Sequence, residues 1–354
     1  MTAPRTDGGS PRMRSAEALR EGVRRVGRAP VILACVFAAT LLTALPFSLM
    51  MREALRAHLG SSLAAEQAAR GVNYQWWTEF TAQADTLGTT FETTIIGFAA
   101  VLDNLSMLAD KESRSAPILW LGACYLLLWL FLAGGILDCY ARARPTRSHE
   151  FFSACGVYFV RFLRLAPIIA LTYYVLFAYV HPVLLGGIYD ELTRDVTVER
   201  TAFLWRAALY LVFGALLVFA NVVFDYAKVR AVVEDRRSMV GSLAAGWRFV
   251  RRNFAGVAAL YGLNAALFIA VLMLYALVAP GADTSGAGIV LGFVVSQVYL
   301  LSRLWVKLVF LASETSLFQG RLAHAGYVAS APAVRAEPPI VERLISPSEK
   351  TRSA

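Results

Sequence analysis

The pattern ACGVYFVR at residues 154–161 recurs as AAGWRFVR at residues 244–251, with Ala, Gly, Phe, Val and Arg in register. An acidic residue ends an apolar run ahead of each copy, Asp138 before the first and Asp225 before the second, and another apolar run follows. Any basic, aromatic segment at a membrane boundary resembles these two. The recurrence of acid, segment and apolar run in the same order nevertheless favours an internal repeat.

We interpret both copies as amphipathic helices on the cytoplasmic membrane surface, each introducing a transmembrane hairpin, and we call them elbow segments. Residues 15–28 form a third elbow segment, because apolar side chains share one helical face and arginines the other. In the two copies, we expect aromatic side chains to insert into the cytoplasmic leaflet while neighbouring arginines stay at headgroup level. These aromatic residues are Phe151, Phe159, Trp247 and Phe249.

The composition is that of an integral membrane protein. Of 354 residues, 57% are hydrophobic and 17% are charged, whereas soluble domains carry about 25% charged residues. The net charge is +9. Its basic residues gather beside apolar runs, so the predicted partner is a bilayer with anionic headgroups, together with a membrane-protein partner, and not nucleic acid.

Six apolar runs are long enough to cross a bilayer, which takes about 20 residues. The first starts near Ala29 and lacks a cleavage site, so we expect it to remain as a span. The six predicted spans are residues 29–51, 115–137, 165–189, 207–224, a part of 253–282 and a part of 284–313.

The predicted organisation is a disordered N-terminus (1–14), an interfacial helix (15–28), a six-span membrane domain (29–330) and a disordered cytoplasmic tail (331–354). The membrane domain includes one large extracytoplasmic loop, residues 52–114. Tyr74, Trp76 and Trp77 in this loop lie either at headgroup level or in the core of a small lobe. An amphipathic helix is expected at about residues 89–109.

Charge sets the expected orientation. Residues 1–28, 138–164 and 225–252 hold seven, five and seven Lys and Arg, whereas the opposite side holds eight together with 13 Asp and Glu. The positive-inside rule therefore predicts that both termini are cytoplasmic, in a bacterial inner membrane.

The fold predicted from this pattern is all-α, with six spans arranged as three hairpins, each preceded by an amphipathic cytoplasmic elbow. Asp138, Asp225 and Glu314 close spans 2, 4 and 6. A carboxylate at the edge of the hydrocarbon needs a cation. The repeat pairs Arg161 with Asp138 and Arg251 with Asp225; pairing with the next basic residue along the chain, Arg142 or Lys228, is equally compatible.

The sequence offers no catalytic, cofactor or metal site. Its four histidines lie in separate segments, and its four cysteines form no CxxC pair. Nucleotide-binding, metalloprotease and serine-hydrolase motifs are missing. We therefore predict a protein without enzymatic activity and without a cofactor.

Polar residues inside the later spans are the remaining candidates: Asn221, Asn264 and Gln297. Such amides usually hydrogen-bond between helices, and the alternative is that they line a cavity or substrate path. Arg303 and Lys307 are four residues apart on span 6, and we expect both to snorkel to the cytoplasmic interface.

Residues 225–239, DYAKVRAVVEDRRSM, followed by Gly246 and Trp247, resemble the central cytoplasmic loop of bacterial six-span proteins. These are similar to the membrane domain attached to some glycerophosphodiester phosphodiesterases. The resemblance covers residues 118–313 at most and rests on the loop pattern. It implies topology and inner-membrane location but no activity, because the phosphodiesterase barrel is missing from this sequence.

Two classes of function fit these observations. The first is a non-enzymatic membrane protein that scaffolds or assists a complex, or organises lipid. The second is a transporter or permease component with a path between spans 4–6. Ionisable residues at mid-span would favour transport, and the sequence places only uncharged amides there.

Overall fold

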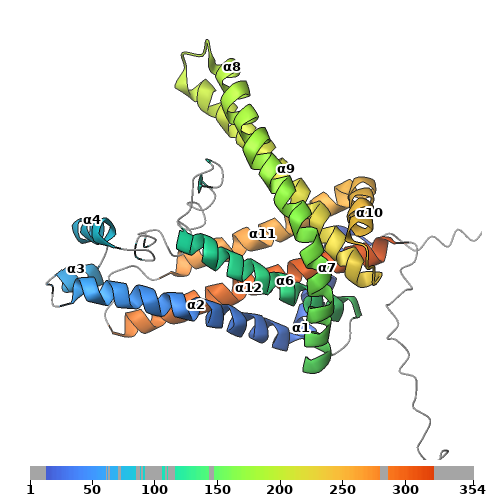
Figure 1. The fold of residues 1–354 in the computed structure, drawn as a ribbon, viewed down its shortest axis with the longest axis horizontal. Coiled ribbons are helices and arrows are strands. Elements are labelled where there is room, and N and C mark those ends of the chain that lie inside the picture. The colour runs from blue at the N-terminus through green and yellow to red at the C-terminus, as the bar shows by residue number, and fades with distance from the viewer. Residues whose placement is uncertain are drawn as a thin grey trace, which may run out of the picture.

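The computed structural model describes residues 13–60, 62, 64–70, 73–84, 88, 91, 106–107, 110, 116–142, 147–279 and 286–322. All regular elements in these ranges are helices (Figure 1). Six are long and apolar enough to cross a membrane: Pro30–Leu59, Leu119–Arg142, Ser148–Thr193, Glu199–Val233, Phe254–Val278 and Ala287–Arg321. The prediction of an all-α protein with six spans is confirmed. The predicted disordered ends, apart from residues 13 and 14, and most of the predicted helix at residues 89–109 lie outside the described residues.

The first two spans are α2 (Pro30–Leu59) and α6 (Ala116–Arg142). The short helices α3 (Ala64–Arg70) and α4 (Tyr74–Gln83) lie beyond the far end of α2 (Figure 1). Trp76 of α4 is buried against Phe80 and donates a hydrogen bond from Nε1 to His58 Nδ1 at 3.0 Å. This aromatic residue therefore belongs to the core of a small lobe, whereas Tyr74 is exposed.

The third and fourth spans form a long arm that diverges from the other spans in Figure 1. Its first half runs through α7 (Ser148–Val175), η2 (Leu176–Val180), η3 (Val183–Ile188) and α8 (Tyr189–Thr193). The widened π-helical turns flank Pro182, which has no N–H to donate to the preceding turn. The second half is α9 (Glu199–Val233).

The last two spans are α11 (Phe254–Val278) and α12 (Ala287–Arg321). The elbow segments correspond to α1 (Ser15–Arg28), the first part of α7, and α10 (Met239–Arg252). We call the end of the spans where they lie the elbow side. Only α1 and α10 are separate helices, because the first copy of the repeat continues without a break into its span.

Each elbow segment packs on the protein, which goes beyond the prediction of a helix lying on the membrane surface. The most extensive helix–helix contacts are those of α1 with α12, α7 with α6, and α10 with α9. An elbow thus packs on the acid-closed end of an even-numbered span. Because α1 packs on the last span, the three units close into a ring.

Glycines allow two of these close crossings. A methyl group on Gly22 of α1 would lie 2.9 Å from the Ser313 nitrogen, and one on Gly246 of α10 would lie 3.0 Å from the Ala227 nitrogen. Gly156, which the repeat aligns with Gly246, faces open space. In that unit the glycine is on the other helix, where a methyl on Gly135 of α6 would lie 2.8 Å from the Phe151 carbonyl oxygen.

Candidate functional site

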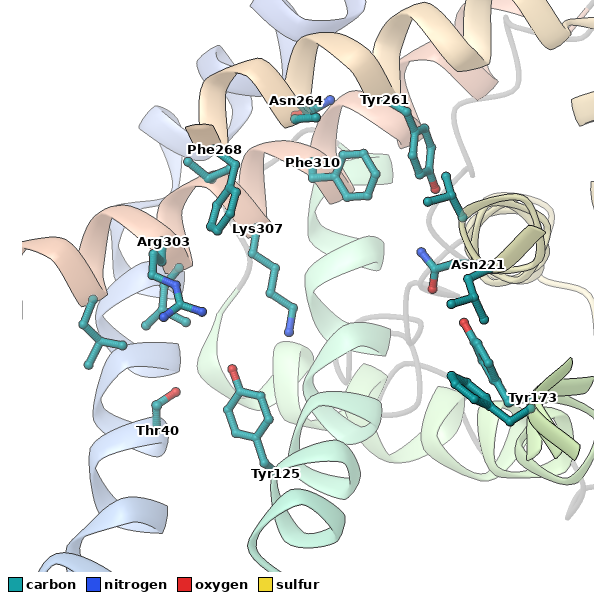
Figure 2. Close-up of a pocket in the computed structure, with 17 residues that line it drawn as sticks. Thr40, Tyr125, Tyr173, Asn221, Tyr261, Asn264, Phe268, Arg303, Lys307 and Phe310 are labelled. Atoms are coloured by element: carbon teal, nitrogen blue, oxygen red, sulfur yellow. The ribbon is translucent and has the colours of Figure 1, made fainter. Parts of the chain in front are cut away.

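A cavity of about 870 Å³ lies between the six spans, and each of them contributes to its wall. Most of the wall is apolar. The polar side chains come from all six spans and include two cations (Figure 2): Thr40, Tyr125, Tyr173, Asn221, Tyr261, Asn264, Arg303 and Lys307.

The cavity lies at a depth that the hydrocarbon would occupy. On α11, which begins at Phe254, the lining residues run from Tyr261 to Phe268. These positions lie about 10 to 21 Å from the elbow-side end of the helix, at 1.5 Å per residue. The hydrocarbon core is about 30 Å thick. The lining residues of α11 therefore lie within the depth of the hydrocarbon core.

The two cations of α12 face this space. The Lys307 Nζ lies 3.3 Å from the centre of the Trp129 ring and 5.3 Å from that of Tyr125. The Arg303 guanidinium lies 5.5 Å from the Tyr299 ring centre. Figure 2 shows the Tyr125 hydroxyl pointing toward the same space as these two side chains. The expectation that both cations snorkel to the interface did not include this cavity, which both side chains line.

No ion pair joins Arg303 or Lys307 to a carboxylate among the residues that the structure describes. The aromatic faces stabilise the ammonium, and because the Lys307 side chain is partly exposed, the cation–π contact contributes about 0.5–1 kcal/mol. They carry no net charge, however. The cavity therefore holds two basic side chains one helical turn apart, neither of them paired with a carboxylate among the described residues.

A network of two acids borders the cavity on the elbow side. The Tyr261 hydroxyl lies 3.1 Å from Asp225 Oδ2 and 2.5 Å from Glu314 Oε1. Asn221 donates from Nδ2 to Asp225 Oδ2 at 2.8 Å, and Lys228 Nζ lies 2.6 Å from Asp225 Oδ1. The residues of this network come from three spans, α9, α11 and α12.

The predicted long-range ion pairs were wrong in their partners. Asp138 pairs with Arg142 at 2.8 Å, and Asp225 pairs with Lys228. Arg161 instead pairs with Asp235 at 2.6 Å, and Arg251 is exposed. The local partners prevail because residues three or four apart on a helix are already neighbours.

The elbow aromatics divide between protein and surface. Phe151 and Phe249 are buried in the hydrophobic core, with 8% of each exposed, so their predicted insertion into the leaflet is wrong. Phe249 packs between Tyr226 and Phe318. Phe159 is half-buried against Phe131. Trp247 is 45% exposed, which leaves it in a position to contact lipid.

The three intramembrane amides lie in different settings. Asn264 joins two spans by donating from Nδ2 to Ser313 Oγ at 3.2 Å, and it also lines the cavity. Asn221 lines the cavity and bonds to Asp225 on its own helix. Gln297 is half-buried and is not part of the cavity wall.

Tyr125, Tyr173 and Tyr261 were not among the residues singled out from the sequence. A tyrosine in an apolar run is most often a packing residue, so its sequence context gave no sign of a shared site.

Among the described residues, no group of three His, Cys, Asp or Glu lies close enough to hold a metal ion.

Comparisons with protein-family models, curated proteins and solved structures found no match. The family resemblance of residues 225–239 therefore remains an expectation from the sequence. The chain is a multi-pass membrane protein by the length and hydropathy of its helices.

Proposed function

We propose that this protein is a non-enzymatic membrane protein that binds an anionic lipid in the cavity between its spans. The observation that carries the proposal is the pair of cations, Arg303 and Lys307, which face an apolar cavity and have no carboxylate partner among the described residues. Uncompensated charges at membrane depth are costly. An anionic group between them would offset that cost.

The form of the cavity favours an amphiphile over a small inorganic anion. Its volume of about 870 Å³ exceeds what a phosphate needs, and its wall is mainly apolar. A phosphate or carboxylate headgroup would lie between Arg303 and Lys307, with Tyr125 as a hydroxyl donor. The acyl chains would follow the apolar wall.

A path for a transported substrate is the second candidate, and a specific observation favours it. Spans α9, α11 and α12 all line the cavity, as a path between spans 4–6 requires. The wall also includes Thr40 of α2 and Tyr125 of α6, which a path confined to the last three spans would not need. An accessory protein that holds lipid at this position, within a larger membrane complex, accounts for both sets of residues.

We place the protein in a bacterial cytoplasmic membrane with the elbow side facing the cytoplasm. The support is the excess of Lys and Arg on that side. Single cysteines at Gln67 and Ser238, both exposed, test the orientation in a chain whose native cysteines are replaced. We expect an impermeant maleimide to label Gln67→Cys in intact cells and Ser238→Cys only after permeabilisation. Labelling of Ser238→Cys in intact cells would mean that the elbow side faces outward.

Native mass spectrometry of the protein purified from mixed phosphatidylglycerol and phosphatidylethanolamine nanodiscs tests the lipid site. We expect the Arg303→Gln/Lys307→Gln variant to lose bound phosphatidylglycerol, by about 10- to 100-fold in apparent affinity, since a hydrogen bond to a charged group contributes about 1.5–3 kcal/mol. Arg200→Gln, an exposed charge at the other end of α9, is the control. Equal phosphatidylglycerol retention by the double variant and the control would refute the proposal.

A further inference from the structure

The contacts around Tyr261 require one more proton than the tyrosine has. Its hydroxyl lies within hydrogen-bonding distance of two carboxyl groups, Glu314 at 2.5 Å and Asp225 at 3.1 Å. A phenol carries a single proton and can donate to only one of them. If both carboxyls were ionised, the second contact would place two acceptor oxygens against each other. One carboxyl must therefore be protonated and donate to the tyrosine oxygen.

The surroundings identify Glu314 as the carboxyl that holds the proton. Asp225 has what a carboxylate needs, a Lys228 ammonium at 2.6 Å and an Asn221 amide donor at 2.8 Å. Glu314 is fully buried, and its Oε2 has no hydrogen-bond partner in the described part of the chain. A buried carboxyl without a cation takes up a proton because its charged form has lost hydration.

The charged and titratable groups near Glu314 among the described residues are as follows, and the one cation that acts on it, Lys228, is already paired with Asp225. On α9 these are Asp225, its partner Lys228, and the buried Tyr226. On α11 the group is Tyr261. From α1, Glu21 and Arg25 are paired with each other, and Arg25 is also bonded to Gln319. On α12 itself, Lys307 and Arg321 each lie seven residues away, about 10 Å along the helix.

We propose that Glu314, Tyr261 and Asp225 form a proton-binding site in the wall of the cavity, and that its proton controls the affinity of the cavity for an anionic lipid. The inference rests on the proposed function for the identity of the ligand, but not for the proton site itself. Tyr261 belongs to both the cavity and the proton site, because it lines the cavity while its hydroxyl points from α11 toward Asn221 of α9 (Figure 2).

Proton movement through this site balances without any other reactant. The Glu314 O–H bond breaks as its proton passes to the Tyr261 oxygen, and the tyrosine O–H bond breaks as its own proton passes to Asp225 Oδ2. Tyr261 is unchanged at the end, Glu314 is a carboxylate, and Asp225 is a carboxylic acid. Release of that proton to water leaves one additional negative charge beside the cavity.

That charge opposes an anionic ligand. Glu314 lies two turns of α12 beyond Lys307, on the same face of the helix, so its carboxylate would offset part of the positive charge offered to the ligand. By linkage, a ligand that binds better to the protonated form also favours protonation. Anionic lipid and proton should therefore bind together and leave together.

Infrared difference spectroscopy over a pH titration tests the proton site without any ligand. We expect wild-type protein to show the carbonyl band of a protonated carboxyl at neutral pH, lost in Glu314→Gln and shifted in Tyr261→Phe, where its hydrogen-bond acceptor is gone. Glu150→Gln, which changes an exposed acid at the start of α7, should leave the band as it is. A wild-type spectrum without a Glu314-dependent band would overturn the proton site.

Phosphatidylglycerol binding in nanodiscs, measured against pH, tests the coupling. Wild-type affinity should fall about tenfold as the infrared band titrates, and Glu314→Gln, the neutral isostere, should bind at every pH with the affinity of the protonated form. Binding that ignores pH in wild-type protein would overturn the coupling. If neither wild-type protein nor any variant retains phosphatidylglycerol while the infrared band persists, the lipid proposal fails and the proton site stands. Thermal unfolding of each variant verifies that it is folded.

Discussion

Asp138 and Asp225 lie near the elbow-side ends of their helices, and each meets a cation within one turn. Neither is an exposed residue, since Asp138 is 5% and Asp225 is 7% exposed. Removing one partner of such a pair therefore leaves a poorly hydrated charge behind. The cation three or four residues on fulfils this need without any tertiary contact, which is why the more distant arginines are available elsewhere.

A double-mutant cycle on Asp225 distinguishes its partners. We expect Asp225→Asn and Lys228→Gln to couple by about 1–3 kcal/mol in the free energy of unfolding, because the two charges are in contact and largely desolvated. Asp225→Asn and Arg251→Gln should show no coupling. Thermal unfolding in detergent supplies the measurement. Coupling to Arg251 of the same size would restore the longer-range pair.

The sequence identified part of the site at this scale. Asn264 was singled out as a polar residue in a span, and its bond to Ser313 of the next span fits that interpretation. Glu314 was identified only as the acid that closes the last hairpin. Its contact with Tyr261 could not be foreseen, because it depends on how α9, α11 and α12 meet.

At the scale of elements, α10 was predicted to lie on the membrane surface and instead packs on the protein. Its sequence has two aromatic residues two positions apart, Trp247 and Phe249, and composition alone does not say which ring faces the protein. In the structure, Phe249 reaches α9 and α12 through Tyr226 and Phe318, while Trp247 contacts only Phe219 among the described rings.

Alanine substitutions measure this division. Phe249→Ala should lower the free energy of unfolding by about 3–5 kcal/mol, since it opens a cavity in the core. Trp247→Ala should cost clearly less, because nearly half of the indole is already exposed. Thermal unfolding of both variants in one detergent provides the comparison. Equal losses would mean that both rings are packed inside the protein.

The two glycines that the repeat aligns make a second test at this scale. Alanine in place of helical glycine normally stabilises by about 1 kcal/mol. Gly156→Ala should show that gain, because nothing lies near its side-chain position. Gly246→Ala should instead destabilise by about 1–2 kcal/mol, since its methyl would press on the backbone of Ala227. A stabilised Gly246→Ala variant would show that α9 and α10 do not cross this closely.

For the whole molecule, hydropathy predicted the six spans because a membrane demands long apolar helices, and each run satisfies that demand alone. The arrangement of the spans depends on pairwise packing, which leaves a much weaker signal in one sequence. Residues 15–28 were correctly predicted to be an amphipathic helix. Their apolar face was assigned to lipid, whereas Ala18, Gly22 and Val26 are buried in the protein.

The contact between α1 and α12 joins the start of the described chain to its end, and this closure is open to a direct test. Met13 lies just ahead of α1, and a side chain at Gly320 would touch it, with a Cβ–Cβ separation of 2.8 Å. Disulfides need about 3.5–4.5 Å between these atoms, so a small shift of the residue ahead of the helix suffices. Met13→Cys and Gly320→Cys, with the native cysteines replaced by alanine, should therefore cross-link under mild oxidation.

A protease site inserted at residue 238, in the turn before α10, makes the link visible. After cleavage, the two fragments should run as one band on a denaturing gel and separate only when a reductant is added. Met13→Cys with Val278→Cys, an exposed position at the far end of α11 and on the second fragment, should separate without reductant. Fragments of the first variant that separate without reductant would mean that α1 leaves α12 and lies on the bilayer. In the described part of the chain, α12 is the span on which α1 packs, and the ring holds only while that contact lasts.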